Sequence, residues 1–426
     1  MSESGLETIV IGAGIAGLTA ARTLAEAGLP VTILEARSRI GGRILTHHVA
    51  DQSIELGAEF IHGRPPELWA LIDEAGLKTY ERGGSQACFQ NGVLKSCHEE
   101  ERSFHLLEGL EDFHGPDMSF AEYAATLKAS EAQRTSILTF VEGFNAADAN
   151  QISAAALGVQ QKAEDSIQGD QAFYLRGGYD RIAQYLASRI VDGKGSILLN
   201  TPAQEIRWHP GSVTVTTKNQ SFSAARIIVT IPLGVLQAGT LAIHPRPDAI
   251  LQAASQLRMG YAVRFTLHFR EPFWTRPRRV WQKDLSFLFS FEEIPPVWWT
   301  THPHPSALLT GWIGGPRCAE LASLTSDEIA ERACSTLARI FSLEPDRLRK
   351  LLIGCHYHDW LHDPYALGAY SYVASGALDA PRQLSEPVAD TLFFAGEHTD
   401  TTGHWGTVHA AMRSGQRAAL QVLGTT

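Results

Sequence analysis

The first 43 residues contain the feature that most constrains how this chain can fold. A short apolar run at residues 9–11 leads into the pattern G-x-G-x-x-G and an alanine-rich segment, and a second apolar run at residues 31–34 ends in Glu35. The glycines of the pattern are Gly12, Gly14 and Gly17. This order predicts a strand, a tight turn, a helix and a second strand, which is the opening unit of a doubly wound α/β fold.

Each part of this unit has a chemical reason to bind a dinucleotide. Gly12 permits the tight turn, Gly14 lets the backbone approach a pyrophosphate, and Gly17 lets the helix and the strand pack closely. The helix N-terminus at Ile15 and Ala16 offers unpaired N–H groups and the positive end of the helix dipole. The carboxylate that closes the second strand can accept hydrogen bonds from ribose hydroxyls, which disfavours NADP with its 2′-phosphate.

The composition is that of an ordinary globular enzyme. At 426 residues, with 44% hydrophobic and 19% charged residues, the chain predicts two domains. The net charge of −10 disfavours a nucleic-acid partner and suits a cationic substrate. No apolar run approaches the roughly 20 residues of a membrane span, and no signal-peptide pattern is present, so we expect a cytoplasmic protein without a membrane partner.

The cysteines point to a reducing compartment and to no metal site. There are five, without C-x-x-C spacing: Cys88, Cys97, Cys318, Cys334 and Cys355. An odd number of scattered cysteines is typical of intracellular proteins.

The continuation of the second strand distinguishes FAD from NAD. Residues 35–43, E-A-R-S-R-I-G-G-R, resemble the E-A-R-x-R-x-G-G-R extension of FAD-dependent amine oxidases. The resemblance implies that the second glycine pair touches the pyrophosphate again and that the arginine contacts phosphate or flavin. The residues that it adds to the cofactor site are Ala36, Arg37, Gly42 and Arg43.

A second motif follows at residues 54–63, I-E-L-G-A-E-F-I-H-G, which resembles the ELGA-x-W-x-x-G stretch of polyamine oxidases. In that family the stretch runs beside the flavin, which implies flavin contacts by Gly57, Ala58, Glu59 and Phe60. The same resemblance places His62 near the flavin ring or the path of the amine. The alternative for His62 is an ordinary loop histidine.

The middle of the chain carries two further family segments. Residues 200–203, N-T-P-A, match the segment whose backbone lies against the adenine, with Ala203 where the family usually has valine. Residues 230–236 match the family signature T-x-P-L-G-V-L, which adds Thr230 and Pro232 to the cofactor site.

Arg264 is the departure from the family pattern. Residues 260–269 alternate as a strand with Val263, Phe265, Leu267 and Phe269 on one face, and Arg264 stands where amine oxidases usually place a lysine. In the family that lysine holds a water against flavin N5. An arginine stays protonated, so it can position a water or grip a carboxylate but cannot act as a tunable base. The alternative is an arginine on a solvated strand face.

Two blocks near the C-terminus complete the resemblance. Residues 360–372 match W-x-x-D-P-Y-S-x-G-x-Y-S-Y, which implies that Tyr370 is one wall of an aromatic site and that Trp360 and Tyr365 line the flavin. Ala369 stands where monoamine oxidases attach the flavin through cysteine, so a non-covalent FAD is expected. Residues 392–409 match F-A-G-E-x-T…T-V-H, which adds four residues to the cofactor site: Gly396, Glu397, Thr407 and Val408.

Other segments give expectations about structure. Residues 97–150 read as an acidic helical region, either a surface that steers a cationic amine or a plain solvated face. Within it, Ile137, Phe140, Val141 and Phe144 form one apolar helix face. Residues 325–328, T-S-D-E, predict a capping box that opens a helix running to residue 341.

These patterns together predict a doubly wound, Rossmann-like FAD-binding domain of residues 1–80, 190–240 and 385–426. A mixed α+β substrate domain is inserted as residues 81–189 and 241–384. The resemblance implies oxidation of an amine, with hydride transfer to flavin N5, hydrolysis of the imine and reduction of O2 to H2O2. Its reaction site is predicted at Arg264, Tyr370, His62 and Trp360. The oligomeric state is left open.

Three alternatives stay open from the sequence. An L-amino-acid oxidase would use Arg264 for the substrate carboxylate. A carotenoid-type desaturase or porphyrinogen oxidase shares the N-terminal fingerprint but should lack the motifs around Tyr370 and Val408. A flavin-binding protein without amine turnover is the third, because the family lysine is missing.

Overall fold

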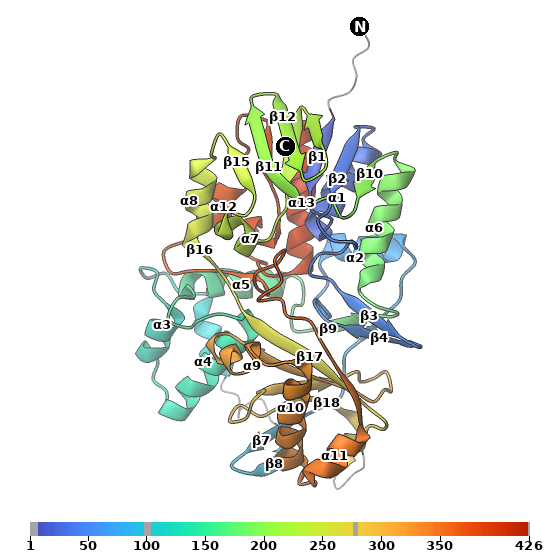
Figure 1. The fold of residues 1–426 in the computed structure, drawn as a ribbon. Coiled ribbons are helices and arrows are strands. Elements are labelled where there is room, and N and C mark those ends of the chain that lie inside the picture. The colour runs from blue at the N-terminus through green and yellow to red at the C-terminus, as the bar shows by residue number, and fades with distance from the viewer. Residues whose placement is uncertain (1–6, 98–103, 276–279, 425–426) are drawn as a thin grey trace.

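The fold is organised around a five-stranded parallel sheet (Figure 1). The structure is a computed structural model that describes residues 7–97, 104–275 and 280–424. Neighbouring strands are parallel throughout, in the order β10 (Ser196–Leu198), β2 (Val31–Leu34), β1 (Thr8–Ile11), β14 (Arg226–Val229) and β23 (Leu392–Phe394). Three distant stretches of sequence thus meet in one sheet, and the predicted α/β fold with a Rossmann-like domain is confirmed.

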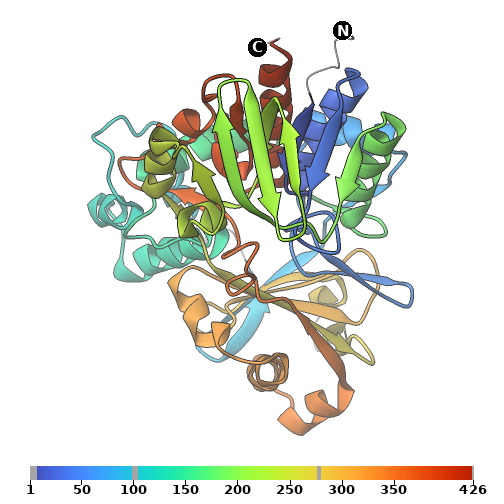
Figure 2. The same ribbon diagram turned by 45° about the horizontal axis from the view of Figure 1, so that its top comes forward.

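Helices cover one face of this sheet and a second sheet covers the other. On the helical face, α1 (Ile15–Glu26) packs against α6 (Asp180–Asp192) and α13 (Val408–Leu423). The other face carries an antiparallel hairpin pair and a parallel edge strand, seen in front in Figure 2: β13 (Ser221–Ala224), β12 (Ser212–Thr217), β11 (Ala203–His209) and β15 (Ala242–His244).

The short apolar run in β1 is explained by these two layers. Val10 packs among the helices, whereas Ile9 and Ile11 pack against the second sheet. Because both faces of the strand are buried, the run is continuous rather than alternating. Helix α13 continues to Leu423, and Val422 in its last turn is still buried in the helical layer.

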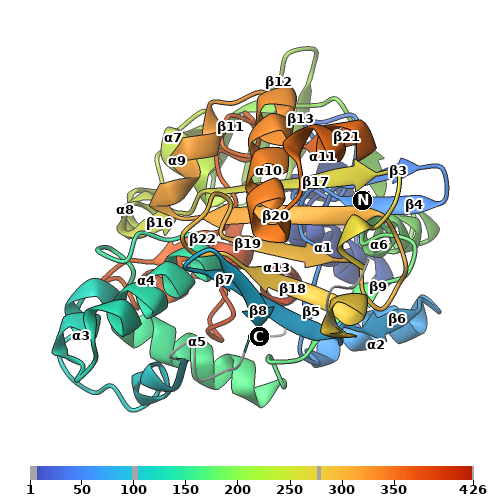
Figure 3. The same cartoon turned by 90° about the horizontal axis from the view of Figure 1, so that it is seen from below.

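The other half of the molecule is built on a seven-stranded sheet, seen from below in Figure 3. Its order is β21 (Leu352–Tyr357), β17 (Ala262–Phe269), β20 (Leu308–Gly314), β19 (Val297–Thr300), β18 (Leu285–Phe289), β7 (Ser85–Gln90) and β8 (Val93–Ser96). Helix α10 (Ser326–Phe341) lies across it, and the predicted capping box of Thr325 and Glu328 is confirmed at its start. The alternating residues Val263, Phe265, Leu267 and Phe269 join the core beneath α10.

A helical arm of α3 (Phe120–Thr126), α4 (Glu131–Asn145) and α5 (Ala154–Ser166) lies beside the seven-stranded sheet (Figure 1). The expected single apolar face of α4 is divided in two. Ile137 and Val141 are buried in the core of the arm, whereas Phe140 and Phe144 line the central cavity, and Phe144 stays 47% exposed.

The cysteines are not all free, contrary to what their spacing suggests. Cys88 and Cys97 form a disulfide with Cα atoms 5.0 Å apart, because the hairpin of β7 and β8 brings them together. Cys318, Cys334 and Cys355 are free. The reducing compartment and the cytoplasmic location stay predictions.

The remaining elements are short and connect these layers. The strands are β3 (Thr46–Val49), β4 (Gln52–Glu55), β5 (Ile61–His62), β6 (Thr79–Glu81), β9 (Ala172–Leu175), β16 (Leu257–Met259) and β22 (Ser371–Val373). The α-helices are α2 (Pro66–Glu74), α7 (Leu233–Ala238), α8 (Asp248–Gln256), α9 (Ala319–Ala322), α11 (Pro345–Leu351) and α12 (Ala380–Leu384). Short 3-10 helices lie at Phe104–Leu106, Glu108–Leu110, Phe273–Thr275, Val280–Asp284, Pro316–Cys318 and Glu397–Thr399.

Within the described ranges, no helix has the length and apolar character needed to cross a membrane. We propose the domain boundaries given above on the basis of the two large sheets.

Candidate active site

One cavity of about 810 Å³ runs from the glycine turns after β1 and β2 to an aromatic chamber beside the seven-stranded sheet. The four residues predicted for the reaction, Arg264, Tyr370, His62 and Trp360, all line it. The predicted cofactor residues line it too, with the exceptions of Gly17 and Ala203. Gly17 packs against the turn instead, and Ala203 begins β11 in the second sheet.

The glycine turns form a cradle whose shape suits a pyrophosphate. Gly14 and Gly42 face each other so closely that a Cβ on Gly42 would lie 3.1 Å from the Cα of Gly14. No side chain caps the N-terminus of α1. Its first N–H groups are therefore free for an anion, and the residues present fit the diphosphate of FAD.

Glu35 closes the nucleotide end of the cavity and is only 6% exposed. One of its carboxylate oxygens accepts from the N–H of Ala13 at 2.6 Å and the other from the N–H of Arg37 at 2.8 Å. These bonds hold the carboxylate at the cavity wall, and each oxygen keeps a second lone pair for a hydroxyl group. The guanidinium of Arg37 is itself fixed by two bonds to Asp363, of 2.8 and 2.6 Å.

A buried carboxylate, Glu397, joins the cofactor cradle to the aromatic chamber. Its oxygens accept hydrogen bonds from Arg43 Nη1 at 2.8 Å, from Ser371 Oγ at 2.6 Å and from the Gly406 N–H at 3.0 Å. Burial on its own would raise the pKa of Glu397, but Arg43, His398 and the Ser371 hydroxyl bring it below its ordinary value. Arg43 also donates to the carbonyl of Ala369, so one ion pair ties together loops from both ends of the chain.

The aromatic chamber has a fixed wall at Tyr370. The Tyr370 hydroxyl donates to the carbonyl of Phe144 at 2.6 Å, and its ring stacks at 6.4 Å and 11° on Trp312. Trp360, which lies on the same connection between β21 and β22 as Tyr370, donates its indole N–H to the Leu56 carbonyl at 2.7 Å. Because both polar groups are already bonded, these side chains present ring faces to the cavity, which favour an amine or a planar group.

Arg264 is buried rather than solvated, being only 5% exposed. Its Nη2 donates to Glu59 Oε2 at 2.5 Å, and Trp299 Nε1 donates to the same oxygen at 2.9 Å. The Nε and Nη1 atoms of Arg264 are buried without a partner among the described residues. Where the family has a lysine, this chain therefore has an ion pair of Arg264 and Glu59 at the cavity wall. Two N–H groups of Arg264 are left without a partner there.

His62 is a neutral side chain at physiological pH. Burial, and then the nearby Arg82 cation, lower the pKa of His62 to about 4, and burial lowers the pKa of His398 to about 4 as well. Neither histidine is therefore an obvious general acid at pH 7, and His62 instead packs edge-on against Phe60 and Phe144.

These histidines should make stability fall as the solution is acidified. The unfolded chain protonates them near their ordinary pKa of 6.5, whereas the folded protein does so only near pH 4, so the unfolded state binds more protons in this window. Each histidine then lowers the free energy of unfolding by on the order of 1–3 kcal/mol by pH 4. The midpoint of thermal unfolding, measured from pH 7 to pH 4.5, gives the slope of stability against pH. The variant His62→Gln should have a smaller slope. An unchanged slope in that variant would contradict a neutral, buried His62.

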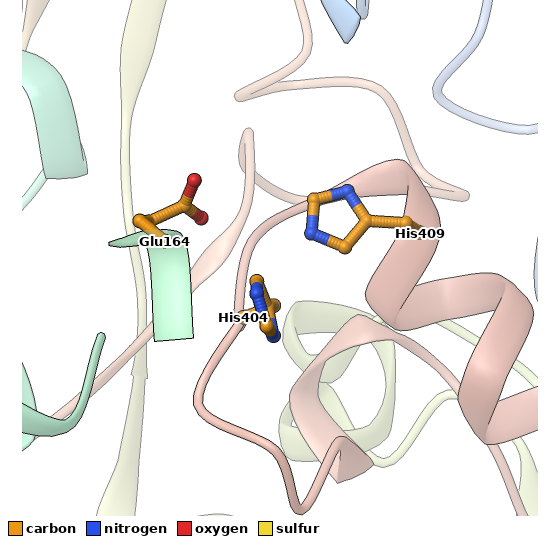
Figure 4. Close-up of side chains that lie close together, drawn as sticks. All are labelled: Glu164, His404 and His409. Carbon is orange, nitrogen blue, oxygen red and sulfur yellow. The ribbon is translucent and has the colours of Figure 1, made fainter. Parts of the chain in front are cut away.

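Three side chains at one edge of the cavity could be taken for a metal site (Figure 4). The donor atoms of Glu164, His404 and His409 lie within 4.8 Å of one another. However, both ring nitrogens of His404 are engaged: Nε2 lies 3.0 Å from the Ala163 carbonyl, and Nδ1 lies 2.7 Å from Arg413 Nη1. The Arg413 cation also disfavours a metal ion, so we interpret the group as a hydrogen-bonded cluster, and the expectation of no metal stays a prediction.

Sequence reasoning missed most of the aromatic chamber. Trp298 and Trp299 are neighbours on β19. Trp298 is fully buried in the core, whereas Trp299 lines the cavity. Other residues that line the chamber were not predicted as site residues: Arg82, Phe140, Phe144, Phe287, Phe289 and Trp312. They come from four separated segments (the residue after β6, α4, β18 and β20), and only the alternating patterns of β18 and β20 could have indicated them.

Comparisons with known proteins agree with this geometry. A family model described as flavin containing amine oxidoreductase matches residues 15–136 and 99–423. The chain is 28% identical to polyamine oxidase 2 of Arabidopsis thaliana, over 96% of this chain and 86% of that protein. It is 25% identical to flavin-containing amine oxidase B of Homo sapiens, over 98% of this chain and 86% of that one.

Solved structures share the fold. Putrescine oxidase with bound putrescine aligns with a TM-score of 0.84 and 21% identity over 99% of both chains. Cyclohexylamine oxidase from Brevibacterium oxydans aligns with a TM-score of 0.83 and 23% identity, again over 99% of both chains. The whole chain therefore has the architecture of these two proteins.

Proposed function

Because this chain belongs to the family of flavin-containing amine oxidoreductases, and is thus an FAD-dependent enzyme that oxidises amines, we propose that its substrate is an amine with an apolar body that fills the aromatic chamber. The observation that supports this proposal is the continuity of one cavity from the glycine cradle to the chamber. We propose O2 as the electron acceptor and a non-covalent FAD, since none of the described residues that line the cavity is a cysteine.

Bound FAD supplies the acceptor for the hydride that leaves the carbon beside the amine nitrogen. The chain's own residues have to orient the amine and keep it neutral, because an ammonium group has no lone pair to assist the loss of hydride. Tyr370 and Trp312 provide ring faces that hold the amine, and Trp360 and His62 narrow the cavity. Arg264 neutralises Glu59, so that this carboxylate does not stabilise the ammonium form.

Replacing Arg264 with methionine should slow flavin reduction strongly at neutral pH. A free Glu59 carboxylate would raise the pKa of a bound amine by about 1–3 units and reduce its neutral fraction about 10- to 1000-fold. Arg264→Lys keeps a cation beside Glu59 and should slow flavin reduction less. The measurement is the rate of flavin bleaching after anaerobic mixing with amine, followed from pH 7 to pH 10. Near pH 10 the rate of the methionine variant should approach that of the unmodified protein.

The double variant Glu59→Gln, Arg264→Met is the control for this argument. It removes the carboxylate together with the arginine, so flavin reduction near pH 7 should be faster than in Arg264→Met alone. Equal rates in the single and the double variant would show that Arg264 acts in another way.

Two other functions remain as outcomes of the same experiment. The free Nε and Nη1 donors of Arg264 would suit the carboxylate of an L-amino acid, and faster bleaching by an amino acid than by its amine would favour that oxidase. If no member of a panel of mono-, di- and polyamines and amino acids bleached the flavin or released peroxide, the chain would bind flavin without amine turnover.

A further inference from the structure

Arg82 is a cation held at one end of the aromatic chamber. It follows β6, and its backbone N–H donates to the Ala172 carbonyl at 2.8 Å, which fixes where the side chain starts. The guanidinium lies 3.0 Å from the ring centre of Phe287 and 5.6 Å from that of Phe60. Its Nη2 donates to Ser286 Oγ at 2.8 Å, whereas its Nε is buried without a partner.

This cation has no counter-ion within the described part of the chain. No described carboxylate lies within the 4.0 Å of an ion pair. The groups that raise the pKa of Arg82 are the Tyr174 hydroxyl and the carboxylate Glu59, and Glu59 is already bonded by Arg264 and Trp299. Burial lowers the pKa of Arg82 to about 10, so the side chain is still charged at neutral pH. A buried cation that lacks an anion is costly, and an anionic ligand group would remove that cost.

Other acids that line the cavity do not fill this role. Glu164 lies beside His404 and His409, and Asp170 is exposed. Because Arg264 is balanced by Glu59 and His62 is neutral, Arg82 is the cation among the described chamber residues that has no carboxylate beside it. A monoanionic carboxylate matches that charge, whereas a dianionic phosphate exceeds it.

Arg82 also lies far from the Tyr370 end of the chamber. A row of rings separates them: the Phe287 and Trp299 centres are 6.0 Å apart, those of Trp299 and Trp312 are 6.2 Å apart, and Trp312 stacks on Tyr370 at 6.4 Å. A group bound by Arg82 is therefore remote from an amine held against Tyr370.

We propose that Arg82 forms an anion subsite, and that this enzyme prefers amines that carry a carboxylate at the opposite end of an apolar chain, as ω-amino acids do. This inference rests on the proposed function, which puts the amine beside Tyr370. It differs from an α-amino-acid oxidase that uses Arg264, because there the carboxylate and the amine share one carbon.

Matched ligands of equal length test the subsite in the holoenzyme. At each chain length from four to eight carbons, the series contains the alkylamine, the α,ω-diamine, the ω-amino acid and the straight-chain α-amino acid. We expect the ω-amino acid to give the lowest Kd for anaerobic flavin bleaching at one or more lengths. Loss of a hydrogen bond between charged groups should make the alkylamine about 10- to 100-fold weaker.

Arg82→Met is the variant that decides the role of the side chain. It keeps an apolar stem on Phe287 and should abolish the preference for the ω-amino acid while leaving the alkylamine nearly unchanged. Arg64→Met is the matched control, because Arg64 also stacks on two rings, those of Trp69 and Phe173, but is exposed and does not line the cavity. The proposal is overturned if the diamine or alkylamine binds as tightly at every length, or if the preference survives in Arg82→Met.

A binding measurement separates this proposal from the proposed function. Hexanoate and its neutral analogue hexanamide are titrated into the oxidised holoenzyme while the flavin absorbance spectrum is recorded. Hexanoate should bind at least about tenfold tighter than the amide, and only when Arg82 is present. If no amine bleaches the flavin but this difference holds, the amine oxidation fails and the anion subsite stands, and equal binding of acid and amide refutes the subsite.

Discussion

Replacing Glu397 with glutamine is expected to lower the free energy of unfolding by about 3–5 kcal/mol and to yield protein that retains little flavin. The variant leaves Arg43 as a partly buried cation, with the Ala369 carbonyl as its other hydrogen-bond partner. It also weakens the bonds from Ser371 and Gly406, which hold the loop before α13 against the cradle. In a protein of this size the midpoint of thermal unfolding should fall by about 3–6 °C.

Two comparisons make this result specific. Glu331→Gln removes a carboxylate that pairs with Arg349 on the exposed face of α10, and it should cost no more than about 1 kcal/mol. The double variant Arg43→Met, Glu397→Gln removes both charges and should be more stable than Glu397→Gln alone. If the double variant were less stable than the single one, the unpaired Arg43 would not be the cause of the loss.

Replacing Gly17 with alanine should prevent helix α1 from packing against strand β1 and the glycine turn between them. The new Cβ would lie 2.0 Å from the carbonyl oxygen of Gly12 and 3.0 Å from Thr230 Oγ1, and the obstructing oxygen belongs to the backbone of the turn. Relief requires α1 to move away from β1, so we expect a loss of more than about 3 kcal/mol and little soluble protein. The measurement is the yield of folded, yellow protein together with its thermal midpoint.

Gly14→Ala separates cofactor binding from folding. A Cβ at Gly14 meets only the Cα of Gly42, at 3.9 Å, so the apoprotein should fold with nearly unchanged stability. The methyl group would instead occupy the space of the pyrophosphate and weaken FAD binding by roughly 5- to 150-fold. Gly83→Ala, where a Cβ meets nothing within 4 Å, should alter neither property. Equal stability of Gly17→Ala and Gly14→Ala would contradict this assignment.

Much of the cofactor half of the molecule was predictable because its signals are local. The turn at Gly12, the buried run in β1 and the carboxylate at Glu35 follow one another within a single βαβ unit, and each constrains its neighbours. The capping box at Thr325 was likewise predictable, since its two partners are three residues apart. The disulfide of Cys88 and Cys97 was not, because it depends on the register of β7 and β8.

The environment of Arg264 illustrates what the alternating pattern leaves undecided. The alternation places Arg264 and Phe265 on opposite faces of β17. It does not determine whether the face of Arg264 is exposed to water or covered by protein. Trp299 from β19 and Glu59 from the loop after β4 cover it, and neither residue is near it in sequence. The same holds for Arg82, whose lack of a counter-ion is visible only once every neighbour in space is known.

The sequence by itself therefore determined the fold class, the FAD cofactor and the oxidation of an amine, because these depend on motifs whose residues are close together along the chain. Only the tertiary structure decided that Arg264 is a buried partner of Glu59, that Glu397 ties Arg43 to the C-terminal loop, and that the chamber is walled by aromatic rings from separated strands and helices. Burial and charge balance are properties of contacts between distant segments, and they decide which amine can enter.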